Sequence, residues 1–397
     1  MTSSNQATVI LDKGKEQSLL RFHPWVFSGA IRKINGHVTD GTPVRVVSSS
    51  GEFLALGHYQ VGSIAVRVLS FTDVPLDDTF WKARLSGAVA LRRALGLLES
   101  ADTNVFRLVH GEGDGLPGLV IDYYNGTAVL QAHSVGMFLI REKLAAILKE
   151  VMGDRLSAVY DKSEKTLPSQ AAVDPGNDYL LGSSGPVIVQ EYGNSFYVDW
   201  VEGQKTGFFV DQRENRRLLQ HYAAGRDVLN MFCYSGGFSF YAMRGGAASV
   251  HSVDASARAI ELTKRNVGLN FPGDTRHEAY VADAFGFMRD ISNRYDLIVL
   301  DPPAFAKHRQ ALHQALQAYK KLNARAFEQI RPGGIVFTFS CSQVVSKEKF
   351  REAVFSGAAI SGRSVRILHQ LNQPPDHPVN IYHPEGEYLK GLVLSVD

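Results

Sequence analysis

Cysteine is scarce in this sequence: only two of the 397 residues, Cys233 and Cys341, are cysteines. Two cysteines cannot build a disulfide framework for a chain of this length, so packing or reactivity must explain each of them. Cys341 stands between two serines, directly after the β-forming run "GIVFTF". A free cysteine is commonly a small apolar packing residue, and the residues alone leave this interpretation open beside that of a reactive thiol.

Long apolar runs and targeting signals are also missing. No stretch reaches the ~20 apolar residues that a membrane helix needs. The first residues, "MTSSNQATVILDKGKEQ", lack the basic start and apolar run of a secretion signal. We therefore expect a cytoplasmic protein in a reducing environment, with no membrane partner. At 45% hydrophobic and 21% charged residues the chain is expected to be globular, and its length predicts two or three domains.

Strong net charge is absent as well. The formal net charge of +2 argues against a protein that coats nucleic acid indiscriminately. The positive excess is nevertheless concentrated at the amino end, where residues 1–72 hold seven Lys and Arg residues against four Asp and Glu. A phosphate backbone could be attracted to such a local excess.

Residues 1–72 are predicted to form a small β-barrel, because short β-rich runs alternate with turn residues. A helix is expected at most around residues 18–27. The segment "RFHPWVFSGAIRKI" joins basic and aromatic residues, as an RNA-binding surface does, and Arg21 and Arg32 are its candidate RNA contacts. The edge of a small core is an equally good explanation of this segment.

Residues 73–190 are predicted to form a middle α+β domain. Apolar residues at three- and four-residue spacings indicate a helix over residues 79–98, and several short strands follow it. The acidic stretch "GEGDGLPG" lacks the alternating ligands of a calcium loop, so it is predicted to be a hairpin connection. The histidines show no ligand spacing with the two cysteines, and we expect no metal.

Residues 191–397 alternate between short β-branched runs and helical stretches. This pattern predicts a doubly wound, mainly parallel, Rossmann-like α/β sheet. Helices are expected from Gly237, up to Asn270, over residues 311–330 and over residues 347–359. Ligands of such sheets bind beyond the carboxyl ends of the strands, so the residues that follow each strand are the candidate site residues.

The turn "CYSGGFS" after the first strand of this domain contains an adjacent glycine pair, Gly236 and Gly237. The three spaced glycines that cradle a pyrophosphate are absent, which disfavours a dinucleotide. Asp254 ends the second strand at a spacing suited to ribose hydroxyls, and Asp283 ends the third, beside Phe285, where it can accept from an adenine amino group. Each acid alone is more often a helix N-cap. Together they indicate a nucleoside cofactor without a pyrophosphate, which is S-adenosylmethionine.

The motif "LIVLDPPAF" follows the fourth strand. Two prolines fix the backbone after Asp301, so the turn is rigid. A rigid turn suits a platform for a flat base, which makes Pro302, Pro303 and Phe305 candidate substrate contacts. An ordinary Asp-Pro-Pro loop is the alternative explanation.

Four motifs, "YSGGFS", "SVDAS", "DPPAF" and "FSCS", resemble those of S-adenosylmethionine-dependent ribosomal RNA methyltransferases of the 5-methylcytosine type, which begin with a PUA domain. The segments "HPWVFSGAI", "GEGDGLPGL", "QKTGFFVDQRENRR", "DHPV" and "EGEYLKG" extend the resemblance over the whole chain. It implies S-adenosylmethionine as cofactor and a single-stranded or loosely paired region of 23S ribosomal RNA as substrate. The expected cofactor residues are Thr206, Gly207, Phe232, Ser235, Gly236, Gly237, Asp254, Ser256, Asp283, Ala284, Phe285 and Asp301.

The resemblance also implies a role for Cys341. Carbon 5 of cytosine is a poor nucleophile, so a thiolate must first add to carbon 6. In the RNA cytosine class this nucleophile lies after the fifth strand, where Cys341 falls, and Asp301 would hold the protonated N3 of the base. Many members carry a second cysteine where this chain has Pro303. The base that removes the proton from carbon 5 is therefore not identified.

Two other functions are compatible with parts of the sequence. A methyltransferase acting on a base amino group, such as guanine N2, also uses an Asp-Pro-Pro turn but needs no thiol, so Cys341 discriminates between the two. A binding protein with a vestigial cofactor fold is disfavoured because every cofactor position retains a usable side chain. The oligomeric state, a homodimer included, is left open.

Overall fold

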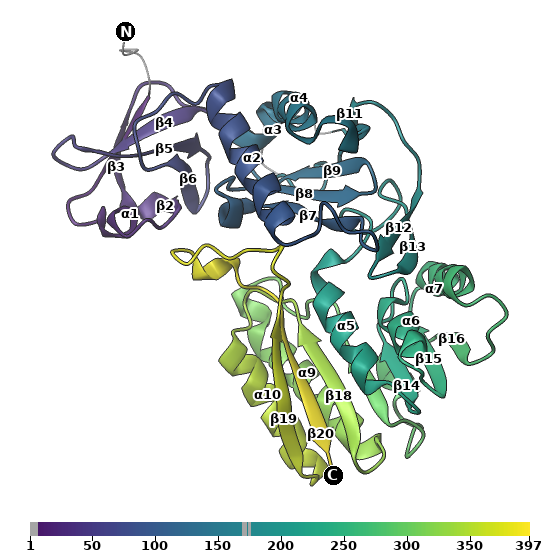
Figure 1. Cartoon of the computed structure of the whole chain (residues 1–397). Coiled ribbons are helices and arrows are strands. Elements are labelled where there is room, and N and C mark those ends of the chain that lie inside the picture. The colour runs from purple at the N-terminus through teal and green to yellow at the C-terminus, as the bar shows by residue number, and fades with distance from the viewer. Residues whose placement is uncertain (1–6, 169–172, 174–175) are drawn as a thin grey trace. The chain divides into compact units, whose positions relative to one another are not determined.

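The computed structural model describes residues 7–168, 173 and 176–397 (Figure 1). The chain forms two compact units and passes between them more than once. The first unit comprises the chain up to Val187, Val198–Phe208 and Pro375–Gly386. The second unit comprises Ile188–Tyr197, Phe209–Pro374 and Glu387–Asp397.

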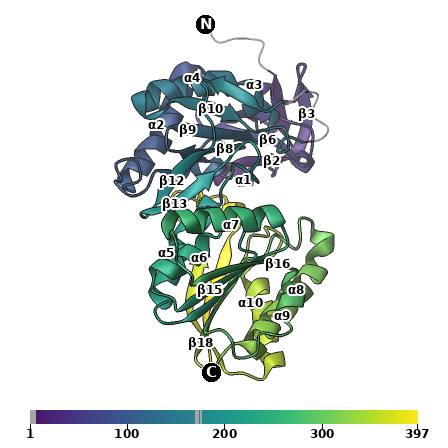
Figure 2. The ribbon, with the colours of Figure 1, turned by 90° about the vertical axis from the view of Figure 1, so that its right-hand side faces the viewer.

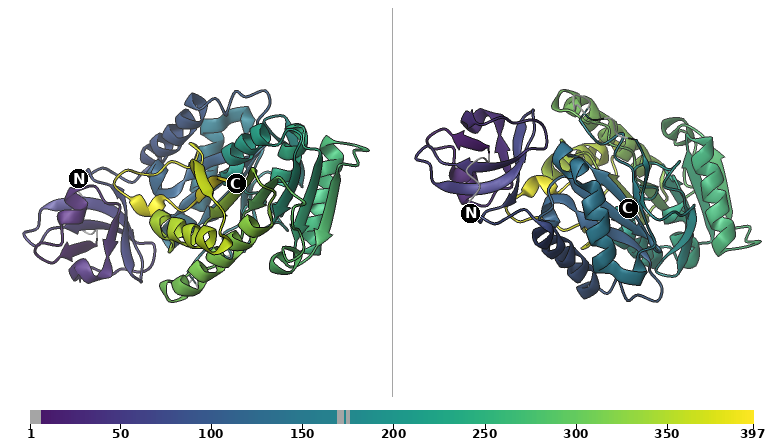
Figure 3. Two further views of the ribbon diagram at one scale, coloured as in Figure 1. Left: turned by 90° about the horizontal axis from the view of Figure 1, so that it is seen from below. Right: turned by 90° about the horizontal axis from the view of Figure 1, so that it is seen from above.

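The first unit begins with a six-stranded sheet of barrel-like shape, drawn in purple in Figure 3. Its strands are β1 (Thr8–Leu11), β2 (Trp25–Phe27), β3 (Ile31–Asn35), β4 (Pro43–Val47), β5 (Phe53–Tyr59) and β6 (Ile64–Ser70), in the order β2-β6-β5-β4-β1-β3. In β4 the buried Val44 and Val46 lie on either side of the half-exposed Arg45, because successive side chains of a strand point to opposite faces. The predicted β-barrel is confirmed.

The expected helix over residues 18–27 is wrong in extent. Only the single turn α1 (Gln17–Leu20) is helical, and β2 follows within five residues. Phe22 has a φ of 61°, which lies in the left-handed region, so a right-handed helix cannot pass through it. Pro24 disfavours a helical conformation of the residue before it.

The remainder of the first unit is a five-stranded sheet covered by helices. The strands are β7 (Val105–His110), β8 (Leu119–Tyr124), β9 (Thr127–Ala132), β10 (Ala158–Asp161) and β11 (Asp178–Leu181), in the order β11-β10-β9-β8-β7. The helices are α2 (Asp78–Ala94), α3 (Val135–Leu139) and α4 (Arg141–Met152). Leu85 of α2, Leu148 of α4 and Ile121 of β8 share one buried core. This is the predicted middle α+β fold.

The end of helix α2 and the connection between β7 and β8 can be compared with the sequence predictions. Helix α2 ends at Ala94, four residues before the expected end, because Gly96 (φ 75°) turns the chain into the left-handed conformation that terminates helices. The stretch "GEGDGLPG" connects the antiparallel strands β7 and β8 through the short 3-10 helix Gly111–Asp114. The predicted hairpin connection is therefore confirmed.

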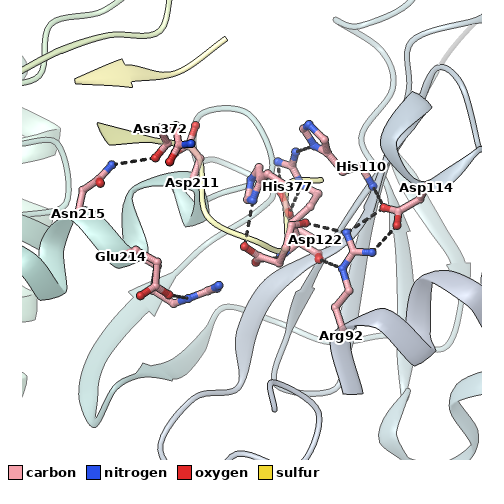
Figure 4. Close-up of polar contacts among 12 residues, drawn as sticks. Arg92, His110, Asp114, Asp122, Asp211, Glu214, Asn215, Asn372 and His377 are labelled. Carbon is pink, nitrogen blue, oxygen red and sulfur yellow. Dashed lines mark hydrogen bonds and ion pairs between the residues drawn. The ribbon is translucent and has the colours of Figure 1, made fainter. Parts of the chain in front are cut away.

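A buried ionic network holds later segments of the chain in the first unit (Figure 4). Arg92 of α2 makes a bidentate pair with Asp114 (2.5 and 2.8 Å) and donates to the carbonyl oxygen of Asp376 at 2.7 Å. The carboxylate of Asp376 in turn accepts from the backbone N–H of Arg107 at 2.9 Å. These charge-assisted bonds fix the segment 375–386 although it follows almost the entire second unit in sequence.

The second unit is built on a seven-stranded sheet (Figure 2). Its strands are β14 (Asp227–Met231), β15 (Ser249–Asp254), β16 (His277–Val281), β17 (Leu297–Leu300), β18 (Gly334–Ser340), β19 (Val365–Asn372) and β20 (Lys390–Val396), in the order β16-β15-β14-β17-β18-β20-β19. The first five strands pair in parallel, and β20 runs antiparallel to both β18 and β19. The predicted doubly wound, mainly parallel sheet is confirmed.

Helices cover both faces of this sheet (Figures 1 and 2). They are α5 (Arg213–Tyr222), α6 (Gly237–Arg244), α7 (Ala257–Asn270), α8 (Ala284–Phe287), α9 (Leu312–Gln329) and α10 (Lys347–Ser361). Phe337 and Phe339 of β18 face α5 and α6, where they meet the rings of Tyr222 and Phe238. Val336, the residue before Phe337, joins the opposite core with α8, α9 and α10. This alternation arises because neighbouring side chains of a strand point to opposite faces.

Smaller elements complete the structure. The hairpin of β12 (Val187–Glu191) and β13 (Asn194–Val198) precedes α5. Short 3-10 helices span Ser28–Ala30, Gly153–Arg155, Val210–Gln212, Arg309–Ala311 and Pro384–Gly386. Among the described residues, no helix combines the length and apolar character that crossing a membrane requires. The prediction that the first residues form no secretion signal concerns in part residues 1–6, which lie outside the residues that the structure describes.

Candidate functional site

The carboxyl ends of five parallel strands meet at one edge of the second unit's sheet. Met231 of β14 pairs with Val253 of β15 on one side and with Leu300 of β17 on the other, and Leu300 pairs with Thr338 of β18. The chain turns from β14 first to β15 and only later to β17, so the strand order reverses between β14 and β17. Doubly wound sheets bind their ligands beyond the carboxyl ends at such a reversal.

The loop after β14 has an unusual backbone. Phe232, Tyr234 and Gly236 have φ angles of 59°, 46° and 81°, and bulky residues rarely adopt the left-handed conformation. Such conformations persist only where the surrounding structure enforces them, and they gather at functional sites. The loop at the reversal point is therefore held in a defined, strained shape.

Helix α7 and the end of β15 enforce this shape. The carboxylate of Asp254 accepts from the backbone N–H of Tyr234 at 3.1 Å and from that of Ser256 at 2.9 Å. Thr263 donates to the carbonyl oxygen of Tyr234 at 2.9 Å, and Asn266 donates to that of Ser235 at 3.0 Å. One acid and two helical side chains thus fix the path of the loop.

The glycine pair of this loop is required by packing. A Cβ atom on Gly236 would lie 2.7 Å from Thr263 Cγ2, and one on Gly237 would lie 2.8 Å from Arg216 Cδ. Both separations are too short for carbon atoms, so larger residues would displace the loop from α7 and α5. The contacts thus give both glycines a packing role, and the close approach of a ligand that the sequence predicted for them stays a prediction.

The acids that follow β15 and β16 occupy different environments. Asp254 is half-buried, and its two oxygens are bound to backbone N–H groups, as described above. Asp283 is exposed and caps α8 by accepting from the N–H of Gly286 at 2.8 Å. Ser256 caps α7 by accepting from Ala259, while Ala284 is buried and the ring of Phe285 is 39% exposed. The cap role that the sequence left open for each acid therefore applies to Asp283, and the cap role of Ser256 was not predicted.

Asp301 lies directly after β17, near the reversal point. Its carboxylate accepts from the side-chain amide of Gln212 at 3.1 Å, and Gln212 accepts from Asn215 at 2.6 Å. Asn215 also contacts the carbonyl oxygen of Asn372 at 3.4 Å (Figure 4). The carboxylate is thus oriented by a chain of amides, and the segment that precedes and begins α5 supplies two of them.

The rest of the Asp-Pro-Pro turn presents both buried and exposed surface. Pro302 is buried and Pro303 is exposed. The ring of Phe305 is half-buried and packs against Tyr319 of α9 with the ring centroids 4.8 Å apart. Burial raises the pKa of Tyr319 to about 12, so its hydroxyl stays neutral at physiological pH. Pro303 is therefore the residue of this turn most open to a substrate.

Cys341 follows β18 immediately and is half-buried. The next residue, Ser342, donates from its hydroxyl to the carbonyl oxygen of Ala306 at 2.5 Å. This bond ties the loop that carries Cys341 to the loop that carries Asp301. Cys233, in contrast, is fully buried, and burial raises its pKa to about 12, which makes it an unreactive packing residue.

Lys390 supports the loop of Cys341 from the neighbouring strand. It begins β20, pairs with Ser340 of β18, and donates to the carbonyl oxygens of Ser342 and Val345 at 2.6 Å each. Its side chain is buried, and this burial lowers its pKa to about 8, while the charge of Cys341 acts in the opposite direction. A buried cation therefore lies in the electrostatic neighbourhood of the thiol.

Four of the predicted residues belong to the first unit. Thr206 is buried there, donates to the carboxylate of Asp122 at 2.6 Å and bonds Tyr124 Oη at 2.9 Å. Gly207, with a φ of 119°, follows it. The two candidate RNA contacts, Arg21 and Arg32, are exposed on the barrel-like sheet. Their roles remain predictions, as does the part of Thr206 and Gly207 in cofactor binding.

Several supporting residues were not identified from the sequence. Gln212 and Lys390 lie in the segments "QKTGFFVDQRENRR" and "EGEYLKG", which resemble the methyltransferases but carry no pattern that assigns these two side chains a role. Thr263 and Asn266 lie three residues apart on one face of α7, an ordinary spacing that assigns them no role. Among the residues that the structure describes, no group of three or more His, Cys, Asp or Glu side chains is arranged to hold a metal ion.

Comparison with known families identifies both parts of the chain. Residues 167–392 match the family of S-adenosylmethionine-dependent methyltransferases, and residues 9–71 match the PUA-like domain. The first match covers more than half of the chain and includes the carboxyl-end loops described above. The second match coincides with the barrel-like sheet.

Similar proteins extend over the full length. "Ribosomal RNA large subunit methyltransferase I" of Alteromonas mediterranea is 38% identical over 396 residues, which cover 98% of this chain and 99% of the relative. The protein of the same name from Klebsiella pneumoniae strain 342 is 36% identical over 403 residues and 100% of both chains.

Solved structures share the fold. A SAM-dependent methyltransferase structure from Streptococcus mutans has a TM-score of 0.84 at 23% identity, covering 98% of this chain and 100% of that chain. A second methyltransferase structure, described as complexed with SAH, has a TM-score of 0.85 at 24% identity and the same coverage. With the reversal-point loops and the family match considered together, the chain belongs to the S-adenosylmethionine-dependent methyltransferases, carries a PUA-like domain, and uses S-adenosylmethionine as its cofactor.

Proposed function

We propose that this protein methylates carbon 5 of a cytosine in 23S ribosomal RNA, through a covalent bond between Cys341 and carbon 6 of the base. The names of its full-length relatives support ribosomal RNA of the large subunit as the substrate. The observation that carries the choice of carbon 5 is the position of Cys341. This thiol is half-buried after β18, in a loop that Ser342 ties to the loop of Asp301.

The cofactor is proposed to bind at the reversal point of the sheet. The backbone of the strained loop 232–236 is available to a cofactor there. The half-buried carboxylate of Asp254 can still accept from ribose hydroxyls, since each of its oxygens has two lone pairs. Asp283 and the exposed ring of Phe285 are suited to the amino group and face of an adenine. These residues fit a nucleoside without a pyrophosphate. S-adenosylmethionine, when bound, supplies an electrophilic methyl group.

The proposed methyl transfer proceeds through a covalent adduct between the protein and the base. The thiolate of Cys341 forms a bond to carbon 6 of cytosine as N3 takes up a proton, which makes carbon 5 an enamine carbon. Carbon 5 then forms a bond to the methyl group as the bond between that group and the sulfonium sulfur breaks, which leaves a neutral thioether. A base then removes the proton from carbon 5, the bond between sulfur and carbon 6 breaks, and the thiolate is regenerated. Asp301, oriented by Gln212, would stabilise the protonated N3 while the adduct exists. Because this chain has Pro303 in place of a second cysteine, a water molecule or another side chain must accept the proton.

Methylation of a base amino group, such as guanine N2, is the alternative for the same fold. It would use Asp301 and the two prolines but would leave Cys341 without a chemical role. Lys390 and Ser342 hold the loop of that cysteine by three hydrogen bonds of 2.5–2.6 Å. This support favours a functional thiol over an incidental one.

The decisive experiment identifies the methylated nucleoside. Unmodified 23S ribosomal RNA is incubated with the purified protein and S-adenosylmethionine, digested to nucleosides and analysed by mass spectrometry, with bisulfite sequencing to locate the position. We expect 5-methylcytidine from the native protein and none from Cys341→Ala. N2-methylguanosine, formed equally by both proteins, would establish the alternative.

The first unit is proposed to supply affinity for RNA. The positive excess of residues 1–72, the exposed Arg21 and Arg32, and the PUA-like match support this assignment. The division into domains 1–72, 73–190 and 191–397, and a location in the cytoplasm, belong to the same proposal. The target cytosine must leave its stack to reach a thiol at the edge of a sheet, so a single-stranded or loosely paired region is expected.

A further inference from the structure

The first unit contains a cavity of about 310 Å³ that none of the chemistry above uses. Five separate stretches line it: the connection from α1 to β2, the end of β6, helix α2, the hairpin connection 112–117, and the segment around Asn380 and Tyr382. The volume is at the lower end of the range for small-ligand sites, about 300–1,000 Å³, so it suits one flat group of nucleoside size.

Exposed aromatic rings form the rim of this cavity. The rings of Phe22 and Tyr382 are 48% and 50% exposed, and their centroids lie 5.3 Å apart. Phe71 meets Phe22 edge to face, also at 5.3 Å. Aromatic rings are ordinarily buried, because covering them with protein removes a large apolar surface from water. A cluster of rings left half in water offers a stacking surface to a ligand.

The backbone of Phe22 explains why its ring lies at the cavity. Its φ of 61° is uncommon for a bulky residue, and such a conformation costs on the order of 1–3 kcal/mol. This conformation terminates helix α1, because the N–H of Phe22 donates to the carbonyl oxygen of Leu19 at 2.9 Å and that of His23 donates to the carbonyl oxygen of Ser18 at 3.0 Å. The turn at the end of α1 leaves the ring half exposed among the residues that line the cavity.

Polar groups line the inside of the cavity. Arg84 of α2 donates to the carbonyl oxygen of Leu69 at 2.9 Å. Glu112 accepts from the indole N–H of Trp25 at 2.8 Å, which fixes its carboxylate at the wall. Asn380 is held by bonds to the backbone of Glu112 and Tyr382. A guanidinium, a carboxylate and a carboxamide are the groups that read the edges of a base.

We propose that this cavity binds an unstacked base of the RNA substrate, with its face on the rings of Phe22 and Tyr382. The inference rests on the proposed RNA substrate and adds a second contact to it. The bound nucleotide is a different one from the methylated nucleotide, because neither Cys341 nor Asp301 lines the cavity. Binding of one flanking base would help to select the site of methylation.

The chemistry of the cavity favours a base over a protein partner. Bases of single strands stack on aromatic side chains and on arginine, and sequence-tolerant binding proteins use this combination. Arg21, the neighbour of Phe22 in the chain, is exposed and can meet the phosphate of the same nucleotide. A protein interface would need a surface of about 800 Å² on each side, whereas this site accommodates a single flat group.

The test compares RNA binding by full-length variants at the rim. Affinities for a fluorescein-labelled single-stranded hexaribonucleotide are measured by anisotropy for the native protein, Tyr382→Ala and Tyr382→Phe. We expect Tyr382→Ala to weaken binding about 5- to 100-fold, as loss of one stacked base does, and Tyr382→Phe to bind as the native protein does. Phe355→Leu, which removes a still more exposed ring (71%) on α10, is the control and should leave the affinity unchanged.

A crosslinking measurement locates the base. Hexamers containing 4-thiouridine are irradiated with the native protein, and we expect the crosslinked peptide to contain Phe22 or Tyr382. Crosslinks elsewhere, or equal affinity of Tyr382→Ala and the native protein, would overturn the proposal. Loss of self-association in Tyr382→Ala, measured by sedimentation, with unchanged RNA affinity would assign the cavity to a second copy of the chain instead. Methylation of ribosomal RNA by the native protein is measured separately, so failure of the cavity leaves the proposed function standing.

Discussion

The ammonium group of Lys390 donates to the carbonyl oxygen of Ser342 at 2.6 Å, and so a residue of β20 holds the loop that begins with Cys341. A second bond, to Val345 at the same distance, closes the contact. The side chain is buried, and a buried cation must be compensated by oriented dipoles or by a negative charge. A thiolate at Cys341 would provide that charge in the active enzyme.

The first prediction concerns Lys390 and the thiol of Cys341. Lys390→Met should slow alkylation of Cys341 by iodoacetamide several-fold at neutral pH, because a nearby cation favours the reactive thiolate. The pKa of Lys390 is lowered to about 8, so its charge is present below that pH and is lost above it. The difference between native and variant should therefore shrink as the pH rises through 8.

The two cysteines make this measurement specific. Cys233 is buried, its pKa is raised to about 12, and it should not react. Labelling followed by mass spectrometry confirms the site, and Cys341→Ala gives the background. Identical pH profiles for the native protein and Lys390→Met would reduce Lys390 to a support of the loop without an electrostatic role.

The second prediction concerns the covalent step. Cys341→Ala should bind S-adenosylmethionine and RNA with native affinity but fail to transfer the methyl group, since the carbon–sulfur bond cannot form. RNA carrying 5-azacytosine at the target should form an adduct with the native protein that survives denaturing electrophoresis. Cys233→Ala is the matched control and should form the adduct. Methylation by Cys341→Ala at a near-native rate would rule out the covalent route.

The third prediction concerns the cofactor site. Asp254→Ala should weaken S-adenosylmethionine binding by about 1–3 kcal/mol in calorimetry, because it removes a charged acceptor and frees the loop at Tyr234. Asp274→Ala removes an acid of the same unit that pairs with Arg276, and it should bind the cofactor normally. If the folded Asp254 variant bound as tightly as the native protein, that residue would be removed from the proposed site.

The fourth prediction concerns RNA electrostatics. Replacing Arg21 and Arg32 by glutamine should weaken RNA binding and lower the dependence of log K on log salt concentration by about one for each lost phosphate contact. Arg351→Gln, which removes an exposed arginine from α10, is the control. An unchanged salt dependence in the double variant would place the RNA contacts on other residues.

The fifth prediction concerns pH and stability. His58 is buried against Trp81, and burial lowers its pKa from 6.5 to about 4. The unfolded chain therefore binds a proton in this range more readily than the folded one does. Its contribution to the free energy of unfolding is full above pH 6.5, and acidification to about pH 4 removes on the order of 3 kcal/mol.

Tryptophan fluorescence can follow this effect in the first unit alone, because Trp25, Trp81 and Trp200 all belong to it. Urea unfolding is measured between pH 7 and 5 for the native protein and His58→Gln. The variant should lose stability less steeply on acidification, by up to one proton. Parallel curves would show that another group, such as His133, whose pKa is also lowered to about 4, governs the acid response.

The sequence by itself determined the local elements and the class of fold. The periodicity of apolar residues in strands and helices can be read from neighbouring residues of the sequence. The alternation of strand and helix patterns after Asp227 was therefore sufficient to predict a doubly wound sheet, and β-rich runs separated by turn residues were sufficient to predict the barrel. The helix predicted around residues 18–27 was wrong in extent, because Phe22 adopts the left-handed conformation that terminates α1. The glycine pair, Gly236 and Gly237, was found from the sequence, but its packing role was not.

Tertiary structure alone decided which distant residues meet. Lys390 reaches Ser342 across 48 positions, and Arg92 reaches the carbonyl of Asp376 across 284. A Cβ atom on Gly113 would lie 1.9 Å from the carbonyl oxygen of Pro378, so two motifs far apart in the sequence pack closely against each other. The sequence alone does not predict such pairs, because long-range contacts depend on packing and burial in three dimensions, whereas helix and strand patterns arise from neighbours along the chain.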